Sequence, residues 1–151
     1  MKYIDNKYNE HKVDSITAKK NGEVWTPPEI IDKMISKIPD EHWKDPTKTF
    51  LDPTCGSGNI LVRMLEKRLA SGVSKFDAIS TLYGVELEQA NVDICKDRLR
   101  CVLGDGIATH DYDEILDKNI VCHDFFDWDF ENWKPKSKFD DSGSDLEDFF
   151  E

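Results

Sequence analysis

The sequence predicts an α/β fold built on a parallel, doubly wound sheet. Short apolar segments typical of buried strands alternate with longer segments whose apolar residues recur every three or four positions. A glycine turn follows the first apolar segment directly, and each of three predicted strands ends at a carboxylate: Asp52, Glu86 and Asp124. Because strand–helix alternation needs crossover connections, we expect parallel strands with a ligand bound at their carboxyl ends.

The first predicted element is a helix that begins at Pro28. Residues 23–28 are expected to be extended, because a residue that precedes proline disfavours the helical conformation, and Pro28 fits the first turn of a helix. Apolar residues then recur at helical spacing until Pro39, which ends the helix. They are Ile30, Ile31, Met34, Ile35 and Ile38.

The rest of the folded region alternates strand and helix. The pattern predicts a strand at residues 49–51, a helix from the glycine turn to Gly72, a strand at 82–85, helices at 90–103 and 112–116, and a strand at 119–122. Residues 78–82 are expected to lead straight into the second strand. The helix at 90–103 places apolar residues on one side, as a helix packed on a sheet does: Val92, Cys95, Leu99 and Val102.

Length and charge divide the chain into three parts. Its 151 residues fit one domain, expected at 23–133, between a flexible arm at 1–22 and an acidic, disordered tail at 134–151. The net charge of −11 is uneven: residues 1–110 hold 16 Lys and Arg against 17 Asp and Glu, and residues 111–151 hold 4 against 14. Because acidic surfaces repel phosphate, we expect no DNA binding by this chain alone.

Composition excludes several other classes of protein. No apolar run approaches the roughly 20 residues that cross a bilayer, and residues 1–10 are too polar for a signal peptide. We therefore expect a cytoplasmic protein without membrane contact. The four cysteines include no CxxC pair, so neither a zinc site nor a redox motif is indicated. Cys122 and His123 are adjacent, but we interpret them as a half-buried thiol beside a surface histidine and expect no metal.

The glycine turn at residues 56–58 lies between a strand and a helix. Glycines let backbone N–H groups approach a ligand without a Cβ clash, and the helix amino terminus behind them favours an anion. Glu86 lies 34 residues after Asp52, where an acid can accept both hydroxyls of a ribose. Leu61 replaces the third glycine of the dinucleotide fingerprint and no GxxxxGK[ST] occurs, so neither a nicotinamide cofactor nor a P-loop nucleotide site is supported.

Four motifs in this order resemble those of bacterial and phage N6-adenine DNA methyltransferases. Residues 22–31, GEVWTPPEII, look like the amino-terminal cofactor motif of that family, and residues 51–61, LDPTCGSGNIL, are similar to its glycine motif. Residues 83–87, YGVEL, and 119–126, NIVCHDFF, resemble its second-strand and third-strand motifs. The resemblance covers roughly residues 20–133. It implies a Rossmann-like domain of the class I methyltransferase type, in the cytoplasm of a bacterium or of a phage's host.

The resemblance also implies S-adenosylmethionine as the cofactor and gives the first motifs their roles. Thr26 would contact the methionine carboxylate, and Asp52 would hold the methionine amino group while the glycine turn closes on it. Glu86 would bind the ribose hydroxyls, with Leu87 packed on the adenine. An ionised carboxylate only accepts hydrogen bonds, which suits an ammonium group or a diol. The positive charge of the sulfonium would also favour an acidic site.

The third-strand motif would bind the adenine. Asp124 would accept a hydrogen bond from the adenine amino group, and the Phe125 backbone would contact the ring edge. The set of cofactor-binding residues that the resemblance implies is Thr26, Pro27, Asp52, Pro53, Cys55, Gly56, Gly58, Glu86, Leu87, Asp124 and Phe125.

The family pattern continues with a fourth strand that ends in an Asn- or Asp-Pro-Pro-aromatic motif, which holds an extruded adenine. The sequence has no such tetrapeptide, because its one Pro-Pro pair, at residues 27–28, belongs to the first motif. Residues 138–145 are typical of a disordered tail, so we expect a sheet truncated after the third strand. A region that recognises the DNA target is also missing. No catalytic residue is therefore assigned, and we expect the chain to be inactive in methyl transfer by itself.

Three functions remain open at this point. The chain can be an S-adenosylmethionine-binding module that acts with a partner or regulates methylation or DNA processing. It can instead be the cofactor-binding half of a split N6-adenine DNA methyltransferase. The third alternative is a non-catalytic scaffold or inhibitor that uses its acidic tail. The intact motif residues favour the first two.

Two features predict contact with another protein. Without a fourth strand, residues 50–51 would form an exposed hydrophobic edge. We therefore expect a homodimer or a complex that covers this edge, unless the amino-terminal arm covers it or residues 125–130 fold back over it. Phe149 and Phe150, among the acids of the tail, would fill a pocket of a partner protein. Trp128, Phe130 and Trp133 are interpreted as packing residues instead.

Overall fold

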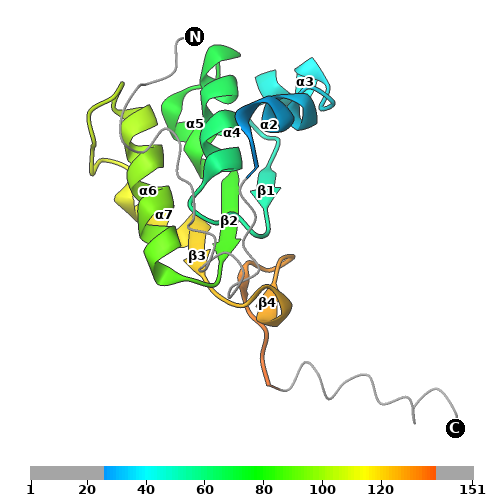
Figure 1. Ribbon diagram of the computed structural model, residues 1–151, viewed down its shortest axis with the longest axis vertical. Coiled ribbons are helices and arrows are strands. Elements are labelled where there is room, and N and C mark those ends of the chain that lie inside the picture. The colour runs from blue at the N-terminus through cyan, green and yellow to red at the C-terminus, as the bar shows by residue number, and fades with distance from the viewer. Residues whose placement is uncertain (1–25, 139–151) are drawn as a thin grey trace, which may run out of the picture.

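A computed structural model describes residues 26–138 of the protein (Figure 1). The arm predicted at 1–22 and the candidate contact residues Phe149 and Phe150 lie outside this range. The elements in chain order are α2 (Pro28–Ile35), α3 (Asp40–Lys44), β1 (Phe50–Asp52), α4 (Asn59–Ala70), α5 (Lys75–Ser80), β2 (Leu82–Glu86), α6 (Gln89–Leu103), α7 (Asp113–Asn119), β3 (Ile120–Cys122), the 3-10 helix η1 (Phe125–Asp127), β4 (Trp128–Asp129) and β5 (Lys134–Pro135).

Three parallel strands form the central sheet, in the order β1–β2–β3. Leu51 of β1 lies opposite Tyr83 of β2, and Val85 of β2 lies opposite Val121 of β3. The predicted parallel α/β sheet is therefore confirmed, and the carboxyl ends of its strands lie at one edge. Within residues 26–138, β1 is an edge strand whose one strand neighbour is β2.

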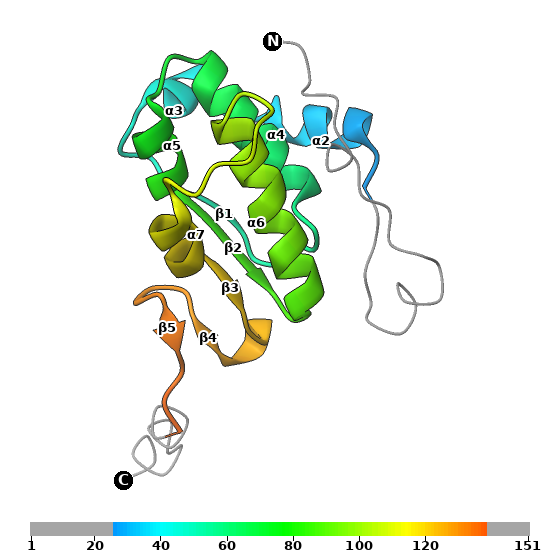
Figure 2. The same cartoon turned by 90° about the vertical axis from the view of Figure 1, so that its left-hand side faces the viewer.

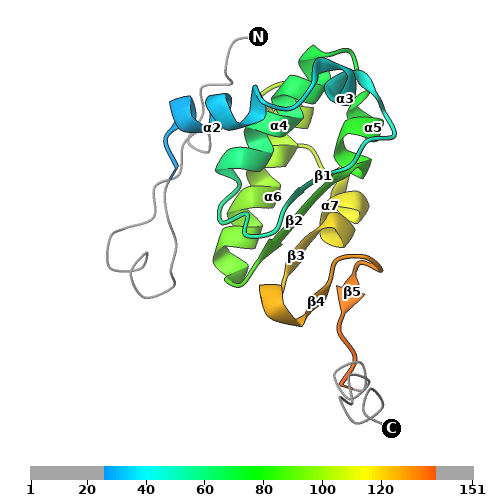
Figure 3. The same ribbon diagram turned by 90° about the vertical axis from the view of Figure 1, so that its right-hand side faces the viewer.

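One face of the sheet is covered by α4 and α6, which pack against each other (Figures 2 and 3). Gly84 of β2 permits this approach, since a Cβ there would lie 2.7 Å from Leu61 Cδ1 of α4. Both long crossover helices lie on this face, and the shorter α7 packs against β2 and β3 on the side away from them (Figures 2 and 3). All four apolar residues predicted on the sheet-facing side of α6 are buried: Val92, Cys95, Leu99 and Val102.

The opposite face of the sheet receives aromatic side chains from the β4–β5 hairpin. β4 pairs with β5 in antiparallel orientation. The ring of Trp133 lies 4.8 Å from that of Tyr83 on β2 and 5.2 Å from that of Trp128. The packing role predicted for the two tryptophans is confirmed. The predicted disordered tail began at residue 134, but residues 134–135 form β5, in which Pro135 pairs with Trp128 and Lys134 with Asp129 of β4.

Several helices differ from their predicted bounds. α2 begins at Pro28 as predicted but ends at Ile35, and α3 and α5 were not predicted. Residues 78–80 belong to α5 instead of leading straight into the second strand. α7 extends to Asn119, which was assigned to the third strand, because its side chain amide donates to the backbone oxygens of Ile79 and Ser80, both at 3.2 Å. No helix within residues 26–138 is long and apolar enough to cross a membrane.

A fully buried arginine on α4 fixes the segment that leads into β1. Arg68 is 0% exposed and its guanidinium donates to four backbone oxygens and one hydroxyl. These acceptors are His42 O (3.2 Å), Trp43 O (3.2 Å), Asp45 O (2.7 Å), Lys48 O (3.3 Å) and Thr81 Oγ1 (2.9 Å). Because the acceptors come from α3, from the turn that follows it and from Thr81 between α5 and β2, one side chain joins three parts of the chain.

One of the two residues that were predicted to be exposed at the β1 edge is buried. Phe50 is 7% exposed, since the ring of Trp43 stacks on it with centroids 4.6 Å apart. The expectation that Phe50 forms an exposed edge is therefore wrong: α3, which was not predicted, covers it. Leu51 points to the other face of the strand and is 40% exposed.

Candidate functional site

The turn between β1 and α4 depends on two glycines with positive φ. Gly58 has φ of 93° and precedes the first residue of α4. A Cβ at Gly58 would lie 2.7 Å from Cys95 Sγ and 3.2 Å from Cys95 Cβ. Only glycine therefore lets the turn pack directly on α6.

Gly56 has a different environment from Gly58. Its φ is 55°, and a Cβ placed there would meet no atom within 4 Å. The turn is held on its other side, because the backbone N–H of Cys55 donates to Val85 O of β2 at 2.9 Å. Gly56 is thus the point of the turn where the backbone faces open space at the carboxyl edge of the sheet, as a ligand-binding turn requires.

Two buried carboxylates lie beside this turn. Asp52 ends β1 and is 7% exposed, and Glu86 ends β2 and is 9% exposed. Asp52 lies opposite Gly84, so Glu86 is two residues further along β2 and its side chain points to the same face. This diagonal corresponds to roughly 8 Å between Cα atoms for adjacent strands.

Each carboxylate is held by one oxygen. Asp52 Oδ1 accepts from the backbone N–H of Thr54 at 3.2 Å. Glu86 Oε2 accepts from the backbone N–H of Glu88 at 2.8 Å and from Nδ2 of Asn91 at 3.2 Å. No hydrogen bond among residues 26–138 engages Asp52 Oδ2 or Glu86 Oε1. The pair therefore offers two acceptor oxygens to a ligand that carries positive charge and hydroxyl groups.

Burial raises the pKa of Asp52 above its ordinary value of 3.8; the backbone hydrogen bond from Thr54 opposes this shift, and the charge of Glu86 adds to it. The ionised form of Asp52 is thus disfavoured in the ligand-free protein. A cationic group placed between the two carboxylates would reverse this effect, because it favours the charged form of both.

Asp52→Asn is expected to make the ligand-free protein more stable than wild type at pH 7. A raised folded-state pKa means that the native state binds the proton more tightly than the unfolded state, so stability falls as pH rises from about 3.8 through the folded pKa. Asparagine does not ionise, so the variant does not lose stability in this way as pH rises. Its Oδ1 can still accept the hydrogen bond from the backbone N–H of Thr54. Urea unfolding of both proteins between pH 4 and pH 7 measures the effect. A stability difference that shrinks as pH rises would contradict it.

The other residues of the predicted set lie less close together. Asp124 follows β3 at the same edge of the sheet, but its Oδ1 accepts from the backbone N–H of Phe126 at 2.9 Å and caps η1. Leu87 is 57% exposed and Phe125 is 39% exposed. Thr26 and Pro27 lie immediately before α2 and are half-buried. Within residues 26–138 no hydrogen bond joins these side chains to the carboxylates of Asp52 or Glu86, so their roles stay predictions.

Cys55 and Pro53 belong to the turn itself. Pro53 is half-buried in the bend after β1, and Cys55 is 5% exposed. The neighbouring thiol of Cys95 and burial together raise the pKa of Cys55 well above its ordinary value, so this thiol stays protonated and serves packing. The thiol of Cys122 donates to Leu87 O at 3.2 Å. No group of three potential metal ligands occurs within the described part of the chain.

Two residues that hold the site were missed by the sequence analysis. Asn91 bonds to Glu86, and the buried guanidinium of Arg98 donates to the backbone oxygen of Ser57 in the glycine turn. Arg98 had a usable signal: it lies on the same helical face as Cys95 and Val102, where a charged residue is out of place. Asn91 had none beyond its position in the first turn of a helix.

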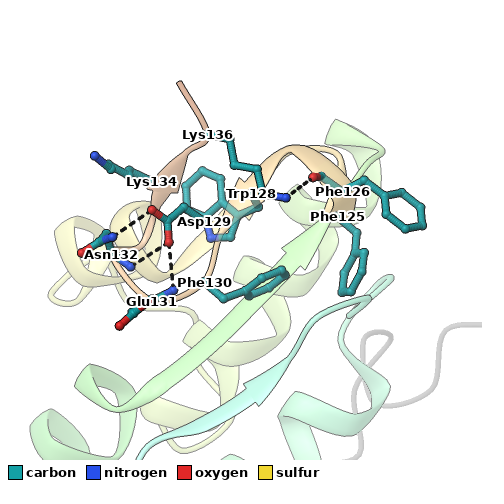
Figure 4. Close-up of a pocket in the computed structure, with 9 residues that line it drawn as sticks. All are labelled: Phe125, Phe126, Trp128, Asp129, Phe130, Glu131, Asn132, Lys134 and Lys136. Atoms are coloured by element: carbon teal, nitrogen blue, oxygen red, sulfur yellow. Dashed lines mark hydrogen bonds between the residues drawn. The ribbon is translucent and has the colours of Figure 1, made fainter. Parts of the chain in front are cut away.

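A separate hollow of about 740 Å³ lies beside the β4–β5 hairpin (Figure 4). Several of its polar side chains bond within the hairpin or to the adjoining η1. Asp129 Oδ1 accepts from the backbone N–H groups of Glu131 and Asn132, at 3.1 and 3.0 Å. Lys136 Nζ donates to Phe126 O at 2.8 Å. These hydrogen bonds stabilise the hairpin, and they give no indication of a ligand in the hollow.

A family described as N-6 DNA Methylase matches residues 9–133, which include the glycine turn and all three strands of the central sheet. Comparison with curated proteins and with solved structures found no significant match.

Proposed function

The chain belongs to the N-6 DNA methylase family, and from that premise we propose that it is an S-adenosylmethionine-binding module for N6-adenine DNA methylation. The observation that carries the proposal is the pair of buried carboxylates, Asp52 and Glu86, beside the open backbone of Gly56. Each carboxylate keeps one oxygen that no residue in 26–138 engages.

The donor set fits this cofactor chemically. S-adenosylmethionine carries an ammonium group, a sulfonium and a ribose diol, and it supplies the activated methyl group when bound. Asp52 would accept a hydrogen bond from the ammonium group and Glu86 from the ribose hydroxyls. Gly56 would let the backbone approach between them. The raised pKa of Asp52 supports the fit, because a buried acid that resists ionisation gains most from a cationic partner.

The remaining roles in the proposal rest on the family resemblance. Thr26 would contact the methionine carboxylate, Leu87 would pack on the adenine, and Asp124 with Phe125 would bind the adenine edge. Leu87 and Phe125 are both well exposed, which supports their availability to a ligand at the carboxyl edge. The side chain of Asp124 would keep its cap of η1 with one oxygen and use the other for the adenine amino group.

Methyl transfer itself would need the Asn- or Asp-Pro-Pro-aromatic motif, which these 151 residues do not contain. We propose that the motif comes from outside these residues, together with the part that recognises DNA. The unpaired edge of β1 supports this view within residues 26–138: Leu51 is 40% exposed, and a further strand could add there. The cofactor-binding half of a split N6-adenine methyltransferase is therefore the second candidate function, and a homodimer that covers this edge is the alternative arrangement.

Calorimetric titration with S-adenosylmethionine tests the proposal. Wild type is expected to bind, and Asp52→Ala and Glu86→Ala are each expected to weaken binding about 100-fold or more, because each leaves a charged or polar ligand group without its buried partner. Asp117→Ala is the matched control, since Asp117 is an exposed acid on α7 that pairs with Lys96. It should bind like wild type.

Two results would contradict the proposal. If wild type neither binds the cofactor nor gains thermal stability in its presence, the module is not a cofactor-binding one and the scaffold alternative gains support. If the purified chain alone transfers a methyl group to DNA, the assignment of the catalytic motif to another region is wrong.

A further inference from the structure

Arg98 is a buried charged residue at the back of the glycine turn. It lies on α6 and is 2% exposed. Its Nη1 donates to Ser57 O at 2.8 Å and to Asn59 Oδ1 at 2.7 Å. Both distances are typical of strong hydrogen bonds from a charged donor. Because Ser57 and Asn59 flank Gly58, one guanidinium holds the turn on both sides of its most constrained residue.

A buried acid of α4 senses the charge of Arg98. Glu66 is 8% exposed and lies seven residues after Asn59, two turns further along the same helical face. Burial raises the pKa of Glu66, and the charges of Arg63 and Arg98 oppose that shift. Within residues 26–138, the hydrogen bonds of Arg98 to Ser57 and Asn59 are the geometry that carries its role. An arginine suits this position because its planar group can donate in several directions at once.

The same helix also holds the ribose-binding carboxylate of the proposed site. Asn91 of α6 donates to Glu86 Oε2 at 3.2 Å, and Arg98 follows Asn91 by seven residues, two turns along the same face. One rigid helix therefore contacts Glu86 near its start and the glycine turn near its middle. The separation of these two parts of the site is therefore set by α6.

We propose that Arg98 is a positioning residue that fixes the glycine turn relative to Glu86, so that both halves of a cofactor can be bound at once. This inference rests on the proposed function. A ligand that bridges the two halves gains affinity from their fixed separation, because no binding free energy is used to order the turn. A ligand that contacts only the Glu86 half gains little.

Binding of S-adenosylmethionine and of adenosine to Arg98→Met and Arg98→Lys tests the inference. Arg98→Met is expected to weaken S-adenosylmethionine binding by about 10-fold, the size typical of removing an outer partner that orients a binding group. Adenosine binding should change by less than about 3-fold, since adenosine does not bridge the turn. Arg98→Lys should recover part of the loss, because an ammonium group can still donate to Ser57 O or Asn59 Oδ1.

Arg100→Met is the matched control. It removes an arginine two residues later on α6, one that pairs with Asp97 and Asp113 instead of the turn, and it should leave the ratio of the two affinities unchanged. Unfolding curves of all variants show whether each is folded at the temperature of titration. Should Arg98→Met fail to fold, Arg98→Lys carries the same comparison.

The outcomes separate the two proposals. If wild type does not bind S-adenosylmethionine, the proposed function fails. If wild type binds, and folded Arg98 variants lose affinity for both ligands equally or for neither, the proposed function stands and the positioning role of Arg98 is overturned. Hydrogen exchange adds a readout without ligand: the amide of Gly58, which donates to Cys55 O at 2.9 Å, should exchange faster in Arg98→Met than in Arg100→Met.

Discussion

Arg68→Met is expected to lower the free energy of unfolding by about 3 kcal/mol or more. Methionine has a similar length and fills much of the space, but it donates no hydrogen bond. Four backbone oxygens and the hydroxyl of Thr81 would lose their donor at a site that is 0% exposed to water. A buried acceptor without a partner costs about 1–3 kcal/mol, and the turn before β1 can relax only in part.

Arg63→Met is the control for this prediction. Arg63 lies on the same helix, and it pairs with Asp32, whose side chain is 58% exposed, at 3.6 Å. The Arg63 side chain is 15% exposed, but its acid partner is exposed to water, so its loss is expected to cost less than that of the fully buried Arg68. Urea unfolding followed by tryptophan fluorescence measures both variants. Equal and small losses for the two arginines would show that the hydrogen bonds of Arg68 do not hold β1 in place.

Gly58→Ala is expected to destabilise the protein by about 3 kcal/mol and to abolish cofactor binding. Two costs combine at this position. A φ of 93° costs a residue with a Cβ about 1–2 kcal/mol. The new methyl group would also lie 2.7 Å from Cys95 Sγ, and overpacking of this kind costs about 1–3 kcal/mol. Relief of the overlap would move the turn away from α6 and from Arg98.

The two costs can be separated with further variants. Gly56→Ala should lose only about 1 kcal/mol, because its φ of 55° lies in the left-handed helical region and no atom is within 4 Å of the new Cβ. Cys95→Ala should reduce the additional effect of Gly58→Ala by about 1 kcal/mol in a double-mutant cycle, since it removes the sulfur from the contact. If Gly56→Ala and Gly58→Ala are equally destabilising, the contact with α6 is unimportant.

The long elements were predictable because their pattern is local. α4 and α6 each bring apolar residues to one face at helical spacing, and β2 is a short apolar run that ends at an acid. α5 was missed although Ser74 precedes it and its side chain accepts from the backbone N–H of Asp77 at 3.1 Å, a helix-start signal that the sequence already contained. With only six residues, α5 is too short to show a clear apolar period.

The candidate site was predictable only where its residues follow strands directly. Asp52 and Glu86 end neighbouring parallel strands, so a correct prediction of the strands also brings the two acids to one edge. Asp124 follows the third strand, but the 3-10 helix after it uses its side chain as a cap. Asp124 comes two residues after Cys122, the last residue of β3. The sheet therefore no longer sets the direction of its side chain, and the strand pattern could not predict where that side chain points.

The sequence by itself determined the parallel sheet, the glycine turn and the two acids at its carboxyl edge, because each follows from residues close together in the chain. Only the tertiary structure decided which buried charges hold these parts. Arg98 reaches Ser57 across 41 residues, and Arg68 reaches Trp43 across 25. Such contacts depend on how α4 and α6 pack against the strands, and that packing is set by the sum of many side chains and not by any local pattern.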